Sequence, residues 1–85
     1  MLYVEINCID NIKINGKIES DNYSKLVDCI RNNKIFNLSD YLSDIYINNE
    51  KNYDNIYVQS DKIICYYTCN NIINYTKRLV EDIKW

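Results

Sequence analysis

The sequence contains no histidine, no proline and a single glycine among its 85 residues. Without histidine, the chain lacks the side chain that most often acts as a general base near neutral pH, and mixed cysteine-histidine zinc sites are excluded. One glycine cannot build the glycine-rich backbone with which phosphate-binding loops surround an anion. These absences exclude most enzyme mechanisms, and we expect a protein without catalytic activity, cofactor or metal.

Long apolar runs are missing as well. No window approaches the roughly 18 apolar residues that a membrane span requires. The segment from Met1 to Asn7 alternates apolar and polar residues, which is a strand pattern and not the basic flank and apolar centre of a signal peptide. We therefore expect a soluble protein of the cytoplasm, or of the host cytoplasm if a phage encodes it, without contact to a membrane.

The composition is typical of one small folded domain. The chain is 47% hydrophobic, 26% charged and 13% aromatic, with nine tyrosines against one tryptophan and one phenylalanine. This aromatic content is too high for a disordered tail, and the length allows one core, so we predict a single domain over residues 1 to 85. The net charge of -2 disfavours direct nucleic-acid binding, which depends on clustered lysine and arginine.

The excess of isoleucine, asparagine, lysine and tyrosine follows what an AT-rich coding sequence would give. Such sequences occur in low-GC bacteria, in their phages and in some large DNA viruses. This composition says nothing about the fold, but it favours a small protein of a mobile element.

The four cysteines are Cys8, Cys29, Cys65 and Cys69. Because no export signal is present, we expect free thiols and not disulfides. Only Cys65 and Cys69 are close in sequence, which is a weak signal for zinc because a site of four thiolates needs two close pairs. We therefore interpret the cysteines as small buried hydrophobic residues.

Two segments near the N-terminus, residues 2 to 8 and 12 to 18, alternate apolar and polar residues as half-buried strands do. A three-residue loop between them keeps the apolar faces together, because it sets Cys8 opposite Ile12. The alternative is a turn at Asn15-Gly16, a dipeptide typical of tight hairpins. The apolar faces consist of Leu2, Val4, Ile6, Cys8, Ile12, Ile14, Gly16 and Ile18.

Two helices are predicted next. Ser20, Asp21 and Asn22 offer caps for a helix that ends near Asn32, with an apolar stripe of Tyr23, Leu26, Val27 and Ile30. Asn37 caps a second, shorter helix that ends near Tyr46, with a stripe of Leu38, Tyr41, Leu42 and Ile45. Residues 45 to 47 also fit a strand.

In the second half, residues 48 to 55 form a polar loop, and residues 56 to 59 and 62 to 68 form a hairpin around Ser60-Asp61. The second strand of this hairpin is apolar on both faces and is predicted to be central in the sheet. A last helix follows from residue 70 or 71 onward. The predicted fold is a two-layer α+β sandwich, a mainly antiparallel sheet of about four strands with helices on one face, in the order ββααββα.

The candidate partner-binding surface is acidic and aromatic. In this interpretation the carboxylates meet a basic surface of another protein and the tyrosine rings supply contact area. The alternative is a solvated helix face with Tyr41 in the core. A second candidate, the outer face of the predicted hairpin, comprises Tyr57, Gln59, Ile64 and Tyr66. The first candidate comprises Asp40, Tyr41, Asp44, Tyr46, Glu50, Tyr53 and Asp54.

These observations favour a small acidic, non-enzymatic binding protein. We expect a phage or mobile-element inhibitor, of anti-CRISPR or another counter-defence type, that occludes a nucleic-acid-binding or defence protein. One alternative is an immunity protein or antitoxin that neutralises a cognate toxin. Another is a homo-oligomeric sponge for a small nucleotide, and the sequence is compatible with a homodimer.

Overall fold

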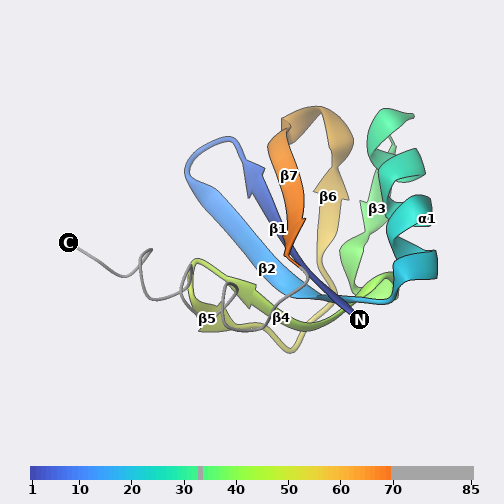
Figure 1. Ribbon diagram of the computed structural model, residues 1–85. Coiled ribbons are helices and arrows are strands. Elements are labelled where there is room, and N and C mark those ends of the chain that lie inside the picture. Colours follow the sequence, from blue (N-terminus) through green and yellow to red (C-terminus); the bar gives the residue numbers. More distant parts are fainter. Residues whose placement is uncertain (33, 70–85) are drawn as a thin grey trace.

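The computed structural model describes residues 1–32 and 34–69, which form an α+β fold with one α-helix and seven strands in this part of the chain (Figure 1). Five strands form sheet A in the order β5-β4-β2-β1-β7, and two strands, β3 and β6, form sheet B. All pairs are antiparallel. The strands of sheet A are β1 (Leu2–Cys8), β2 (Ile12–Ile18), β4 (Leu42–Ile47), β5 (Glu50–Lys51) and β7 (Ile63–Cys69).

The β1–β2 hairpin confirms the predicted three-residue loop. Cys8 pairs with Ile12, and the loop residues Asp10 and Asn11 adopt φ values of 62° and 60°, which aspartate and asparagine tolerate better than other non-glycine residues. The alternative turn at Asn15-Gly16 is wrong, because Gly16 lies inside β2 opposite Val4.

Steric crowding favours glycine at position 16. A Cβ atom on this residue would lie 3.1 Å from the main-chain oxygen of Ser43 and 3.4 Å from Cβ of Leu42. The glycine therefore permits the close approach of β4 to β2.

The first predicted helix is present as α1 (Ser20–Arg31). Leu26 is fully buried at its centre, whereas Asp21 in the first turn and Arg31 in the last turn suit the helix dipole. The expected cap is not used, because Glu19 occupies the N-cap position without a side-chain hydrogen bond.

The second predicted helix is wrong. Asn37 does act as a cap, since its Oδ1 accepts a hydrogen bond from the Ser39 amide at 3.0 Å, but it caps only the short 3-10 helix η1 (Leu38–Asp40). Strand β4 follows. An irregularity in the β2–β4 register, where Asp44 has a φ of 49°, lets both Leu42 and Ile45 face the core. The bulge thus gives a strand the three-residue apolar spacing of a helix.

The predicted hairpin of residues 56 to 68 is also wrong. Strand β6 (Tyr57–Gln59) pairs with β3 (Ile35–Asn37), and β7 pairs with β1 at the edge of sheet A instead of lying at its centre. Between them lies the 3-10 helix η2 (Ser60–Lys62). Ser60 keeps β6 and β7 in different sheets, because its hydroxyl donates to the carbonyl oxygens of Cys29 at 2.9 Å and Lys34 at 2.6 Å and so holds the start of η2 beside the end of α1.

The predicted two-layer sandwich, with a sheet of about four strands and the order ββααββα, is therefore wrong in its number of strands and helices. Sheet A has five strands, and one α-helix is present in the described part of the chain. The helix predicted from residue 70 onward lies outside the described residues. Within residues 1–32 and 34–69, no helix is long and apolar enough to cross a membrane.

The core lies between the inner face of sheet A and a layer formed by α1, η1 and sheet B (Figure 1). The opposite face of sheet A, called the outer face below, carries the polar residues of the alternating strands. The buried apolar residues are Val4, Ile6, Cys8, Ile14, Ile18, Leu26, Phe36, Leu38, Leu42, Ile45 and Val58.

Candidate protein-binding surface

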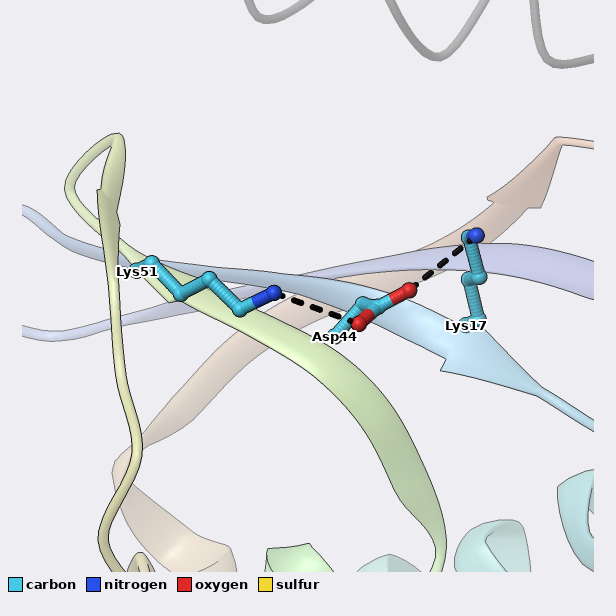
Figure 2. Close-up of polar contacts among 3 residues, drawn as sticks. All are labelled: Lys17, Asp44 and Lys51. Carbon is cyan, nitrogen blue, oxygen red and sulfur yellow. Dashed lines mark hydrogen bonds and ion pairs between the residues drawn. The ribbon is translucent and has the colours of Figure 1, made fainter.

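Asp44 lies between two lysines on the outer face of sheet A (Figure 2). Its carboxylate oxygens are 3.1 Å from Nζ of Lys17 and 3.4 Å from Nζ of Lys51. The hydrogen bonds to these lysines lower the pKa of Asp44, and the hydrogen bond to Asp44 raises the pKa of Lys17. Asp44 therefore carries a charge that its own chain already compensates.

Tyrosine rings flank both lysines. Nζ of Lys51 lies 5.9 Å from the ring centre of Tyr46 and 5.8 Å from that of Tyr53, whereas Nζ of Lys17 lies 5.8 Å from that of Tyr3. These separations allow cation–π attraction. The outer face thus presents alternating tyrosine, lysine and carboxylate groups on β1, β2, β4 and β5.

A row of paired residues crosses all five strands of this face. Glu5 of β1 pairs with Tyr67 of β7 and with Asn15 of β2, and Asn15 pairs in turn with Tyr46 of β4, which pairs with Lys51 of β5. Because the partners lie directly opposite one another, their side chains share one face of the sheet. Strand alternation predicts that these polar positions of β1 and β2 share the face opposite the core, but it gives no signal for the hydrogen bonds between them.

Glu5 and Asn15 form the buried centre of the row, with exposed fractions of 5% and 1%. Glu5 accepts hydrogen bonds from Nδ2 of Asn15 at 3.1 Å, from Nδ2 of Asn7 at 3.2 Å, and from the Tyr67 hydroxyl. These three hydrogen bonds satisfy acceptor sites of the carboxylate, which helps to explain how the sheet tolerates a buried acid. The row ties β7, β1 and β2 together.

The remaining predicted acidic residues separate into two groups. Asp40 and Asp54 lie on neighbouring segments, because Oγ of Ser39 donates to the main-chain oxygen of Asp54 at 3.4 Å and accepts from the Ile56 amide at 3.2 Å. Glu50 pairs with Ile47, so strand alternation places it on the opposite face of β5 from Lys51.

Tyr53 is 86% exposed and precedes Asp54 directly. We call Asp40, Tyr53 and Asp54 the acidic rim. Of the four acidic residues predicted between positions 40 and 54, only Asp44 forms an ion pair within the described part of the chain. The rim thus contains two exposed carboxylates that form no ion pair with the described residues, and one of them directly follows an exposed tyrosine.

Tyr41 is not part of this surface. Its ring packs edge-on against Phe36, with 6.1 Å between the ring centres, and its hydroxyl lies 3.3 Å from Sγ of Cys29. This hydrogen bond and burial raise the pKa of Tyr41. Tyr41 therefore packs against the core, as the alternative interpretation predicts.

The second predicted surface is divided between two sheets. Tyr57 of β6 and Ile64 of β7 are 69% and 68% exposed, whereas Tyr66 of β7 packs against the core. These residues do not form one hairpin face, because β6 and β7 are not paired with each other in the described structure.

The cysteines have different environments. Cys8 is buried, which raises the pKa of its thiol, and Cys29 is half-buried beside Tyr41. Cys65 is exposed, so its interpretation as a core residue is wrong. The described residues contain no group of three or more potential metal-ligating acids, cysteines or histidines.

Comparison with known proteins gives no family assignment. No protein-family model, no curated protein and no solved structure matches the chain.

Proposed function

We propose that this protein is a small non-enzymatic inhibitor that binds a partner protein with a basic surface through its acidic rim. The observation that carries the proposal is a pair of exposed carboxylates, Asp40 and Asp54, which lie on neighbouring segments and have no ion-pair partner in the described part of the chain. The highly exposed Tyr53 directly precedes Asp54. Carboxylates of this kind attract a basic surface, and an exposed tyrosine supplies contact area at a low entropic cost.

The class of partner follows from the sequence composition and the charge of the rim. A surface that binds nucleic acid carries clustered lysine and arginine, and an acidic rim can occupy such a surface in place of phosphates. The excess of isoleucine, asparagine, lysine and tyrosine, which an AT-rich coding sequence would give, supports an origin in a mobile element. The proposed activity is therefore counter-defence by occlusion.

The test begins with affinity capture of partners from a lysate of a low-GC bacterium, followed by binding measurements with the captured protein. The double variant Asp40→Lys with Asp54→Lys should raise Kd by about tenfold or more, because two attractive charges become repulsive. Asp44→Asn should change Kd much less, since Lys17 and Lys51 already compensate Asp44.

The matched control is Asp28→Lys with Asp61→Lys, which changes the net charge by the same amount on α1 and η2. These residues are exposed and form no ion pair in residues 1–32 and 34–69. If the control weakens binding as much as the rim variant, net charge and not the rim determines affinity. If the captured partner has no basic surface, the proposal is wrong.

A further inference from the structure

The centre of the outer face of sheet A is shielded from water. Glu5 and Asn15 lie on this face, opposite the core, yet they are only 5% and 1% exposed. Oδ1 of Asn15 is also buried and has no hydrogen-bond partner among residues 1–32 and 34–69. On a sheet face that borders water such an acceptor would be hydrated, because unpaired polar atoms are costly to bury. The centre of this face is therefore covered.

The elements of the described part of the chain do not supply this cover. Helices α1 and η1 and sheet B form the layer on the inner face of sheet A (Figure 1). Helix η2 packs against α1. The strands of sheet A lie beside one another and cover neither of its faces. The segment of this chain that remains to cover the outer face is residues 70–85.

This segment starts where it can reach the outer face. Strand β7 ends at Cys69, which pairs with Tyr3 on β1, two residues before Glu5. Sixteen residues follow Cys69, and as an α-helix they would extend about 24 Å. The five strands of sheet A span about 19 Å from β7 to β5 at the usual strand spacing. One helix after β7 is therefore long enough to cross the whole face.

The sequence of the segment suits the chemistry of this face. Tyr67 lies opposite Glu5 in the sheet, and their side chains share the outer face. Tyr46 lies opposite Asn15 in the same way. The two tyrosine rings offer apolar surface on either side of the buried polar centre, where an aliphatic stripe can pack. The segment has such a stripe at helical spacing, with charged residues on the other side. The stripe comprises Ile72, Ile73, Thr76, Leu79, Val80 and Ile83, and the charged side comprises Lys77, Arg78, Glu81, Asp82 and Lys84.

We propose that residues 70–85 form an amphipathic helix that docks on the outer face of sheet A, with its apolar stripe against Tyr46 and Tyr67 and above the buried centre of the row. Sheet A then has a layer on each of its faces. Asp40 and Asp54 of the acidic rim are exposed, and they lie on η1 and on the connection that follows β5. Docking of the helix and partner binding through the rim are therefore tested separately.

NMR spectroscopy of the full chain, with labelled isoleucine, leucine and valine methyl groups, tests the contact directly. The methyl groups of Leu79 and Ile83 should show nuclear Overhauser effects to the rings of Tyr46 or Tyr67, and residues 72–83 should have helical backbone chemical shifts. Random-coil shifts in this segment, or methyl contacts to other parts of the molecule alone, overturn the proposal. Contacts that arise only between differently labelled copies in a mixed sample also overturn it, because a second copy then supplies the cover.

A pair of matched variants tests the orientation of the helix. Leu79→Asn with Ile83→Asn should raise the equilibrium constant of unfolding at least about tenfold in urea denaturation, because two apolar side chains lose their burial. Arg78→Asn with Asp82→Asn is the control, since it introduces the same residue twice on the charged side and leaves the net charge unchanged. The control should change this constant less than about threefold. Equal effects of the two double variants overturn the proposed orientation.

Discussion

The turn between β4 and β5 contains a position at which glycine should stabilise the fold. Asn48 and Asn49 connect these strands with φ values of 49° and 70°, the left-handed conformation that two-residue hairpin loops require. Oδ1 of Asn49 is buried and has no hydrogen-bond partner among residues 1–32 and 34–69. Asn49 therefore lowers the free energy of unfolding in two ways, through its left-handed backbone and through its unsatisfied acceptor.

The expected gain for Asn49→Gly follows from three contributions. Removing the unsatisfied acceptor recovers about 1 to 3 kcal/mol. Relief of the left-handed backbone adds at most about 1 kcal/mol, because asparagine tolerates this region well. The greater entropy of glycine in the unfolded chain costs about 0.4 to 1 kcal/mol. The free energy of unfolding should rise by about 1 to 2 kcal/mol, which corresponds to about 4 to 8 °C in Tm for each kcal/mol in a domain of this size.

Asn48→Gly provides the matched control. Its side-chain Oδ1 accepts a hydrogen bond from the Lys13 amide at 2.9 Å, so the same substitution removes a useful bond across to β2. This variant should be no more stable than the wild type, and it should be less stable than Asn49→Gly by at least about 1 kcal/mol. Urea denaturation followed by circular dichroism measures both. Equal changes for the two variants, or a loss of stability for Asn49→Gly, would refute the reasoning.

Two further predictions concern the contacts between β2 and β4. Gly16→Ala should lower the free energy of unfolding by about 1 to 2 kcal/mol in urea denaturation, because its Cβ would press on the Ser43 main chain, and unchanged stability would contradict this close approach. The pKa of Asp44 is lowered in the folded state, so its stabilising contribution is complete above the ordinary value of 3.8 and is lost as the pH falls below that value toward the folded pKa. The pKa of Lys17 is raised, so its contribution is present below the ordinary value of 10.5 and is lost as the pH rises above it. Thermal melts of Asp44→Asn should show a weaker acid-side decline than the wild type, and identical declines would show that the ion pairs do not contribute.

The sequence predicts the parts of this fold that depend on local alternation. The β1–β2 hairpin and α1 follow from apolar periodicity, because both segments have one buried face and regular geometry. The apolar spacing of β4 predicts a helix, since a bulge at Asp44 shifts the alternation of the strand by one residue. A bulge depends on the neighbouring strand, so a single sequence does not reveal it.

Pairing between distant segments was the other source of error. The sequence pattern predicts that β7 pairs with β6, its neighbour in sequence. In the structure, the hydrogen bonds of Ser60 to Cys29 and Lys34 hold β6 beside β3 instead. These bonds depend on the position of α1, which local patterns do not contain. The predicted binding surface is divided for a related reason: its first four residues, which the pattern assigns to a helix, lie on η1, β4 and the residue between them.

The pairing of β1 with β7 also determines when the fold can form. Tyr3 lies opposite Cys69, so the strand at the start of the chain finds one of its two partners only after nearly all of the described residues are available. The β1–β2 hairpin can close early, but the second edge of β1 stays open until β7 arrives, and Glu5 lacks its bond from Tyr67 until then. Closing so long a loop slows folding relative to local pairing. During synthesis on the ribosome, sheet A therefore cannot be completed before β7 has emerged from the exit tunnel.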